Sequence, residues 1–271
     1  MYTPEEIMEL VIATGQKKIK KTLQAKWILG FLGGALIALG YLGYVRVAAP
    51  MIEEWGSLAT FIGACVFPIG LILILLGGGE LVTGNIMAVS LAWWDKKVTT
   101  KELLKNWAVI TAANLIGAVA VAYVFGHVLG LTSAEPYLQE TILIAQAKIS
   151  AHPLEAFLSG IGANWFVGMS LWLCYGAKDS MGKIMGVWFP VMTFVAIGFQ
   201  HSVANMFIIP AAIFEGGATW SQFIANVVPV YLGNVVGGAI FVSLFYYQAY
   251  HQKAAEPLAE PEATLHTIIK E

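Results

Sequence analysis

Long apolar runs separated by short polar connections make up most of this sequence. A helix needs about 20 predominantly apolar residues to cross a bilayer, and six stretches reach that length. The pattern therefore predicts an all-α integral membrane protein with six transmembrane helices. The predicted crossings are residues 27–47, 57–94, 107–130, 154–176, 184–214 and 221–248.

Two of these crossings are interrupted by polar residues. The second contains ELVTGNIM at 80–87, and the fifth contains GFQHSVANMF at 198–207. Polar groups at membrane depth are costly unless they line a cavity or pack against protein. We therefore expect the second and fifth helices to be broken into half-helices, with both breaks lining one pore. The alternative is a pair of kinked, closed helices whose polar groups satisfy each other.

The two halves of the chain correspond at a fixed offset of 120 residues. Each half contains three crossings, an odd number, so the second half enters the membrane from the opposite side. This pattern predicts an inverted 3+3 repeat, in which matching broken helices indicate a permeation site. The matching pairs are Glu80 with Gln200, Asn85 with Asn205, Asn114 with Asn234 and Gly117 with Gly237.

The starts of the second half-helices have asparagines. Asn85 and Asn205 occupy these positions, where asparagine is a favourable N-cap residue. We predict both as helix-break caps, together with Gln200 at the second break. Inversion points the two half-helix N-termini at each other near the midplane, where their partial positive charge favours an anion.

Composition supports a membrane protein and excludes several other classes. The chain is 58% hydrophobic and 12% charged, with a mean hydropathy of +0.72, whereas soluble domains carry about 25% charged residues. A net charge of −2 without a basic patch argues against nucleic-acid binding. Cys65 and Cys174 have neither ligand spacing nor a disulfide framework. We expect no cofactor and no metal site.

The distribution of basic residues predicts the orientation. Residues 1–26 are expected to form an amphipathic cytoplasmic helix that starts after Thr3-Pro4, ahead of a channel domain at 27–250. Residues 251–271, rich in Ala, Glu and Pro, form a cytoplasmic tail expected to be partly disordered. Of the 15 basic residues, all but Arg46 and Lys148 lie in segments on one side of the membrane. Both termini are therefore predicted to be cytoplasmic.

A few side chains near the breaks could act on a permeant. His201 can exchange a proton near neutral pH, because an unperturbed imidazole has a pKa of about 6.5. Thr83 is the polar residue at the first break, and Asn164 is another intramembrane polar group. Lys148, on a predicted surface helix at 138–150, is either a solvated charge or a collector of anions at the pore mouth. Asn106-Trp107 is predicted to anchor the chain at a membrane interface.

Apolar residues beside the breaks could form constrictions that strip water from a permeant. Leu71, Leu81 and Phe194 flank the breaks, and Val82 and Val167 lie close to them.

With these motifs the sequence resembles the formate/nitrite transporter family. The resemblance rests on ELVTGNIM, Asn114-x-x-Gly117, Lys148, GANWFVG and GFQHSVANMFIIP. It implies an aquaporin-like fold in a bacterial inner membrane and a homopentamer with one pore per protomer. The implied permeants are small monovalent anions of weak acids: formate, nitrite, hydrosulfide or lactate.

The resemblance also implies roles for individual residues. It assigns the central histidine to His201, its threonine to Thr83, the vestibule lysine to Lys148 and a polar asparagine to Asn164. The implied constriction residues are Leu71, Leu81, Val82, Val167 and Phe194. Two departures are visible: Val82 stands where formate channels carry Phe, and Gln200 stands where they carry an acidic residue. Both make the chain look closer to the hydrosulfide-channel branch.

Two other classes of protein share some of these features. An aquaporin-like water or neutral-solute channel would share the inverted repeat, but TGN and VAN replace the Asn-Pro-Ala signature. An intramembrane enzyme is not expected, because the only aspartates, Asp95 and Asp179, lie in loops and HExxH is absent. Ser170 or Ser202 with His201 lacks a nucleophile elbow. The sequence does not decide between channel conduction and anion–proton symport.

Overall fold

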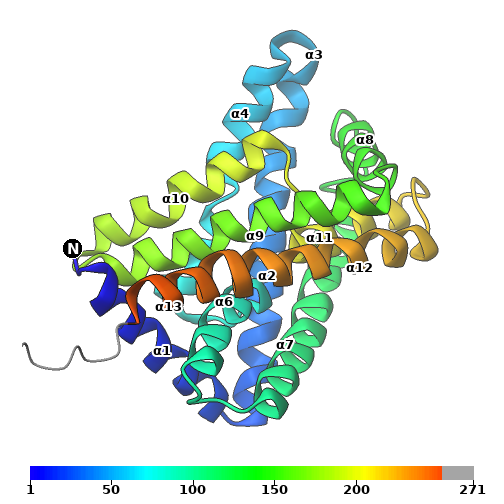
Figure 1. Cartoon of the computed structure of the whole chain (residues 1–271). Helices are drawn as coiled ribbons and strands as arrows, with labels where there is room; N and C mark the ends of the chain where they lie inside the picture. Colours follow the sequence, from blue (N-terminus) through cyan, green and yellow to red (C-terminus); the bar gives the residue numbers. More distant parts are fainter. Residues whose placement is uncertain (252–271) are drawn as a thin grey trace, which may run out of the picture.

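The structure is a computed structural model that describes residues 1–251 of the 271-residue chain. Helices form this part of the chain, and it contains no strand. The tail prediction for 251–271 falls almost entirely outside the described residues. Figure 1 shows the long helices packed as a bundle, with α1 (Pro4–Lys20) at the lower left and α8 (Tyr137–Ile149) at the upper right.

Within residues 1–251, six helices are long and apolar enough to cross a membrane, which confirms the predicted number of crossings. Several contain a π-helical or 3₁₀ segment in addition to α-helix. The crossings are α2 (Leu23–Ala48) with η1 (Ala49–Met51) and α3 (Ile52–Trp55); α4 (Ser57–Val66) with α5 (Ile69–Ile72) and η2 (Leu73–Gly78); α7 (Thr100–Val121) with η3 (Ala122–Val128); α9 (Pro153–Gly176); α10 (Ser180–Ile197); and α12 (Trp220–Val236) with η4 (Gly237–Leu244) and α13 (Phe245–Tyr250).

The second and fifth crossings are broken, as predicted. Their second half-helices are α6 (Val82–Trp94) and α11 (Ser202–Phe214), each 13 residues long. Thirteen residues extend about 20 Å, which is too short to cross a hydrocarbon core of about 30 Å. Both half-helices are buried along most of their length. Such burial lets polar groups occupy the middle of the bundle without facing lipid.

The amphipathic helix α1 begins where the sequence predicts. The Thr3 side chain accepts a hydrogen bond from the Glu6 N–H, and the Glu6 side chain accepts one from the Thr3 N–H, which forms a capping box. Helix α1 packs on α6, and a Cβ at Gly15 would overlap the Ala88 carbonyl. The N-terminal helix is therefore seated directly against the first half-helix.

Helix α8 is held against the end of α2. The Arg46 guanidinium lies 3.3 Å from the centroid of the Tyr137 ring. Arg46 Nη1 also donates to the Leu131 carbonyl at 3.3 Å. These contacts set the position of α8. Lys148 lies in the last turn of this helix.

Candidate permeation site

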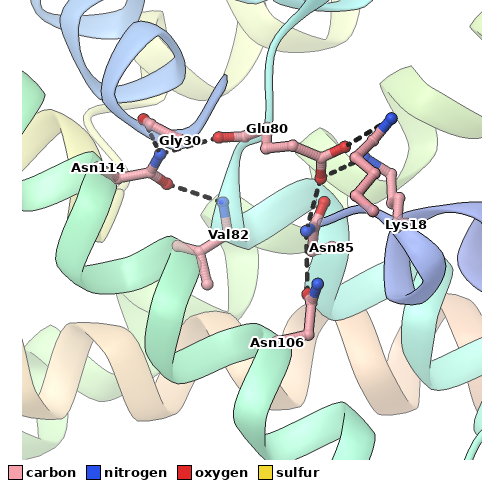
Figure 2. Close-up of polar contacts among 8 residues, drawn as sticks. Lys18, Gly30, Glu80, Val82, Asn85, Asn106 and Asn114 are labelled. Carbon is pink, nitrogen blue, oxygen red and sulfur yellow. Dashed lines mark hydrogen bonds and ion pairs between the residues drawn. The ribbon is translucent and has the colours of Figure 1, made fainter. Parts of the chain in front are cut away.

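An asparagine from a neighbouring helix holds the first break open. Asn114, on α7, accepts a hydrogen bond from the Val82 N–H at 2.8 Å. Its amide donates to the carbonyls of Gly30 at 2.6 Å and Glu80 at 2.8 Å (Figure 2). Asn114 is fully buried. A single side chain thus satisfies the backbone groups that unwinding exposes.

The Glu80 carboxylate lies at the centre of a buried polar cluster. Its Oε2 accepts from Lys18 Nζ at 2.9 Å and from the Asn85 amide at 2.8 Å (Figure 2). The Asn85 amide also donates to Asn106 Oδ1 at 3.0 Å. The Glu80 side chain is only 3% exposed, so its charge is compensated by the ammonium of Lys18.

The second break repeats this arrangement. Asn234 accepts from the Ser202 N–H at 2.9 Å and donates to the Gln200 carbonyl at 3.3 Å. The Asn205 amide donates to Gln200 Oε1 and to Asn226 Oδ1, both at 2.8 Å. The offset of 120 residues therefore relates the hydrogen-bond networks as well as the sequence. We call the two sides of the molecule the Glu80 end and the Lys148 end.

The predicted N-cap roles of Asn85 and Asn205 are wrong. The N-cap residue of α6 is Leu81 and that of α11 is His201, so both asparagines lie inside their half-helices. The Val82 N–H is satisfied by Asn114 from another helix, which makes a capping side chain unnecessary there. Gln200 directly precedes the N-cap of α11 and is not the cap itself.

Two polar residues of these networks were not predicted correctly from the sequence. Asn106 was placed wrongly, and Asn226 was not identified. Asn106 was predicted to lie at a membrane interface, yet it is 1% exposed and bonds to Asn85. Asn226 takes the same position in the second half and bonds to Asn205. The two residues are themselves 120 apart, so the repeat carried the signal that would have found them.

The two half-helices meet at a hydrogen bond between His201 and Thr83. His201 Nδ1 accepts from the Ala204 N–H at 3.2 Å and thereby caps α11. On the other edge of the ring, Nε2 lies 2.9 Å from Thr83 Oγ1 on α6. Because Nδ1 is an acceptor, the proton of a neutral ring is on Nε2 and is donated to Thr83. The Thr83 hydroxyl then retains a hydrogen for another acceptor.

A cavity of about 250 Å³ reaches the His201 side chain from the Lys148 end. Of the site residues predicted from the sequence, four line it: Lys148, Phe194, His201 and the predicted cap Gln200. The Phe194 ring lies 6.0 Å, centroid to centroid, from both His201 and Phe67, which also lines the cavity. Apolar rings therefore surround the approach to the imidazole.

Lys148 faces this cavity and is half-buried. Its Nζ lies 6.0 Å from the centroid of the Tyr41 ring. Loss of hydration lowers the pKa of Lys148 from 10.5 to about 8. The ammonium is thus charged at neutral pH in an environment that strengthens its attraction for anions.

The remaining predicted residues lie deeper in the protein. The Asn164 amide donates to the carbonyls of Asn234 at 2.7 Å and Thr83 at 3.3 Å, which ties the two breaks together. The other predicted constriction residues do not line the cavity and pack in the same apolar core as Phe194. These buried residues are Leu71, Leu81, Val82 and Val167.

Six crossings, two buried breaks and a cavity that reaches His201 define a membrane channel or transporter. The family model for formate/nitrite transporters matches residues 5–248 of the chain. The chain therefore belongs to the formate/nitrite transporter family.

Three similar proteins place the chain more closely. It is 56% identical over 250 residues to the uncharacterized transporter YrhG of Bacillus subtilis (strain 168), covering 92% of this chain and 94% of that protein. It is 50% identical over 252 residues to the formate channel BtFdhC of Bacillus thuringiensis, with coverages of 93% and 97%. A solved pentameric formate channel with formate bound is 28% identical with a TM-score of 0.76, covering 86% of this chain and 99% of that one. These relatives are transporters and channels, not enzymes.

Proposed function

We propose that the protein carries formate, and other small monovalent anions of weak acids, across a bacterial inner membrane. The observation that carries this proposal is that His201, which is hydrogen-bonded to Thr83, lines the same cavity as Lys148. The 50% identity to a formate channel supports formate as the principal permeant. Nitrite and hydrosulfide belong to the same chemical class, and Val82 leaves more room than a Phe would for either. The working unit is a homopentamer, as in the solved formate channel.

The cavity suggests an order of events for the anion. The Lys148 ammonium draws it from solution into the cavity. Past Lys148, the Phe67 and Phe194 rings exclude water, which makes passage of a bare ion expensive. The Thr83 hydroxyl, which has its hydrogen free, donates to an oxygen of the permeant. Leu71, Leu81, Val82 and Val167 form the apolar path beyond that point.

His201 contributes in two ways. As a neutral ring it holds Thr83 in the donor orientation through Nε2–H. As a proton relay it must accept a proton on Nδ1, which requires it to release the Ala204 N–H. Proton relay by His201 therefore requires the hydrogen bond that caps the start of α11 to break.

The substitution His201→Asn tests the relay. Asparagine is a good N-cap residue, so α11 keeps its first hydrogen bond while the titratable ring is lost. In proteoliposomes we expect proton-coupled formate uptake to fall at least roughly tenfold, with anion conduction retained. Formate flux and internal pH are recorded together, and water flux by light scattering serves as the test for the aquaporin-like alternative.

Thr83→Ser is the matched control, because it keeps the hydroxyl beside His201. Its proton-coupled flux should stay close to that of the unmodified protein. Unchanged proton coupling in His201→Asn would remove His201 from the relay. Fast water flux without formate flux would instead overturn the proposed function.

A further inference from the structure

Each end of the molecule has a lysine near its break, and the two lysines have different electrostatic settings. Lys18 on α1 and Lys148 on α8 each lie beside the first polar residue of a break. Lys18 forms an ion pair with Glu80 at 2.9 Å, and Lys21 lies 3.9 Å from the same carboxylate. Lys148 is beside Gln200, which has no charge. A compensated cation therefore lies at the Glu80 end and an uncompensated cation at the Lys148 end.

Gln200 keeps the geometry of the Glu80 cluster without its charge. Gln200 Oε1 accepts from the amides of Asn205 at 2.8 Å and Asn226 at 2.9 Å. Gln200 Nε2 donates to the Lys148 carbonyl at 3.4 Å, a bond that a carboxylate could not make. The amide is thus tied to the backbone of Lys148 and not to its ammonium.

In the part of the chain that the structure describes, no carboxylate forms an ion pair with the Lys148 ammonium. Among residues 1–251, the ion pairs within 4.0 Å do not include Lys148. The titratable groups that line its cavity are Tyr41, Tyr44 and His201, none of which is anionic at neutral pH. Glu140, on the same helix, is 7% exposed and does not line the cavity. The cavity therefore has a net positive charge.

We propose that Gln200 makes the Lys148 end a stronger capture site for small monovalent anions than the Glu80 end, so that half-saturation differs between the two directions of transport. The proposal rests on the proposed function and deepens it. One uncompensated unit charge at the mouth changes anion affinity by roughly fivefold at separations of several ångströms.

Detailed balance limits where this asymmetry can be observed. With equal pH on both sides and no voltage, a passive pathway has the same permeability in both directions at low anion concentration. A tighter site lowers the half-saturation concentration and the maximal flux by the same factor. The two ends therefore differ in half-saturation concentration, and net flow has no preferred direction.

Exchanging the two residues gives the sharpest experiment. Formate flux is measured in oriented proteoliposomes from each end, for Gln200→Glu, Glu80→Gln and the double variant. In each half the residue at this position accepts from the matching asparagine, Asn85 or Asn205, and Glu and Gln can both make that bond, so both variants should fold. Gln139→Glu is the matched control, because Gln139 is exposed on the same helix as Lys148.

We expect the unmodified protein to have a half-saturation concentration roughly fivefold lower from the Lys148 end. Gln200→Glu should abolish this ratio, the double variant should invert it, and Gln139→Glu should leave it unchanged. The proposal would be overturned if the unmodified protein had equal half-saturation concentrations from the two ends. It would also be overturned if neither Gln200→Glu nor the double variant changed their ratio. If Gln200→Glu fails to assemble, Glu80→Gln alone tests the proposal. It should lower the half-saturation concentration for formate measured from the Glu80 end. Absence of formate flux in the unmodified protein would instead contradict the proposed function.

Discussion

At the scale of single residues, the Lys148 ammonium makes transport sensitive to pH on one side. Its pKa is lowered to about 8, so the charge is complete well below pH 8 and is lost as the pH rises through that value. Formate stays ionised throughout this range. We expect half-saturation from the Lys148 end to rise roughly fivefold between about pH 7 and about pH 9, with the other side held constant.

Lys148→Arg is the control for this pH dependence. The guanidinium stays charged over the whole range, so the half-saturation concentration should no longer change with pH. His201, Tyr41 and Tyr44 share the cavity and remain in the variant. If Lys148→Arg kept the same pH dependence, one of these groups would be responsible, and Lys148 would not be the titrating cation.

Residue-level predictions from sequence were most specific where the chemistry at a break singled out a side chain. His201 and Thr83 could be selected because polar groups are rare at membrane depth, whereas the role of Lys148 came from the family resemblance. The N-cap prediction for Asn85 and Asn205 failed because residue preference alone does not show which helix supplies the hydrogen bond. The Val82 N–H is satisfied by Asn114, 32 residues away in sequence. Such partners depend on packing between helices.

At the scale of elements, close approach of helices sets where the breaks lie. The sequence was sufficient for the six crossings and the two broken helices, because apolar length and polar interruption are local properties. The π-helical segments η2, η3 and η4 could not be predicted, since no local signal in the sequence marks them. Glycines bring α2 within reach of α7, so that Asn114 can bond to Gly30.

Gly117 tests this packing. A Cβ there would overlap the Phe31 carbonyl, a backbone atom that cannot rotate away. We expect Gly117→Ala to destabilise the protein by about 1–3 kcal/mol, through separation of α7 from α2. Thermal unfolding in detergent measures the effect. Gly77→Ala, where nothing lies within 4 Å of the added Cβ, should change stability much less. Equal losses in both variants would mean that close packing at Gly117 does not determine the outcome, because helix propensity alone favours Ala over Gly.

At the scale of the whole molecule, inversion of the repeat places two similar polar clusters at opposite ends. Helix α1 covers one end and α8 the other (Figure 1). The predicted orientation puts α1 and both termini in the cytoplasm, because nearly all basic residues lie on that side. If so, the uncompensated Lys148 faces outward. The lower half-saturation concentration would then belong to uptake from outside.

Cysteine labelling in intact cells tests this orientation. Cys65 and Cys174 are first replaced by alanine, and single cysteines are introduced by Gln139→Cys on α8 and Lys101→Cys at the start of α7, both exposed positions. A membrane-impermeant maleimide should label Gln139→Cys in intact cells and Lys101→Cys only after lysis. The reverse pattern would place Lys148 in the cytoplasm, and the lower half-saturation concentration would then belong to export.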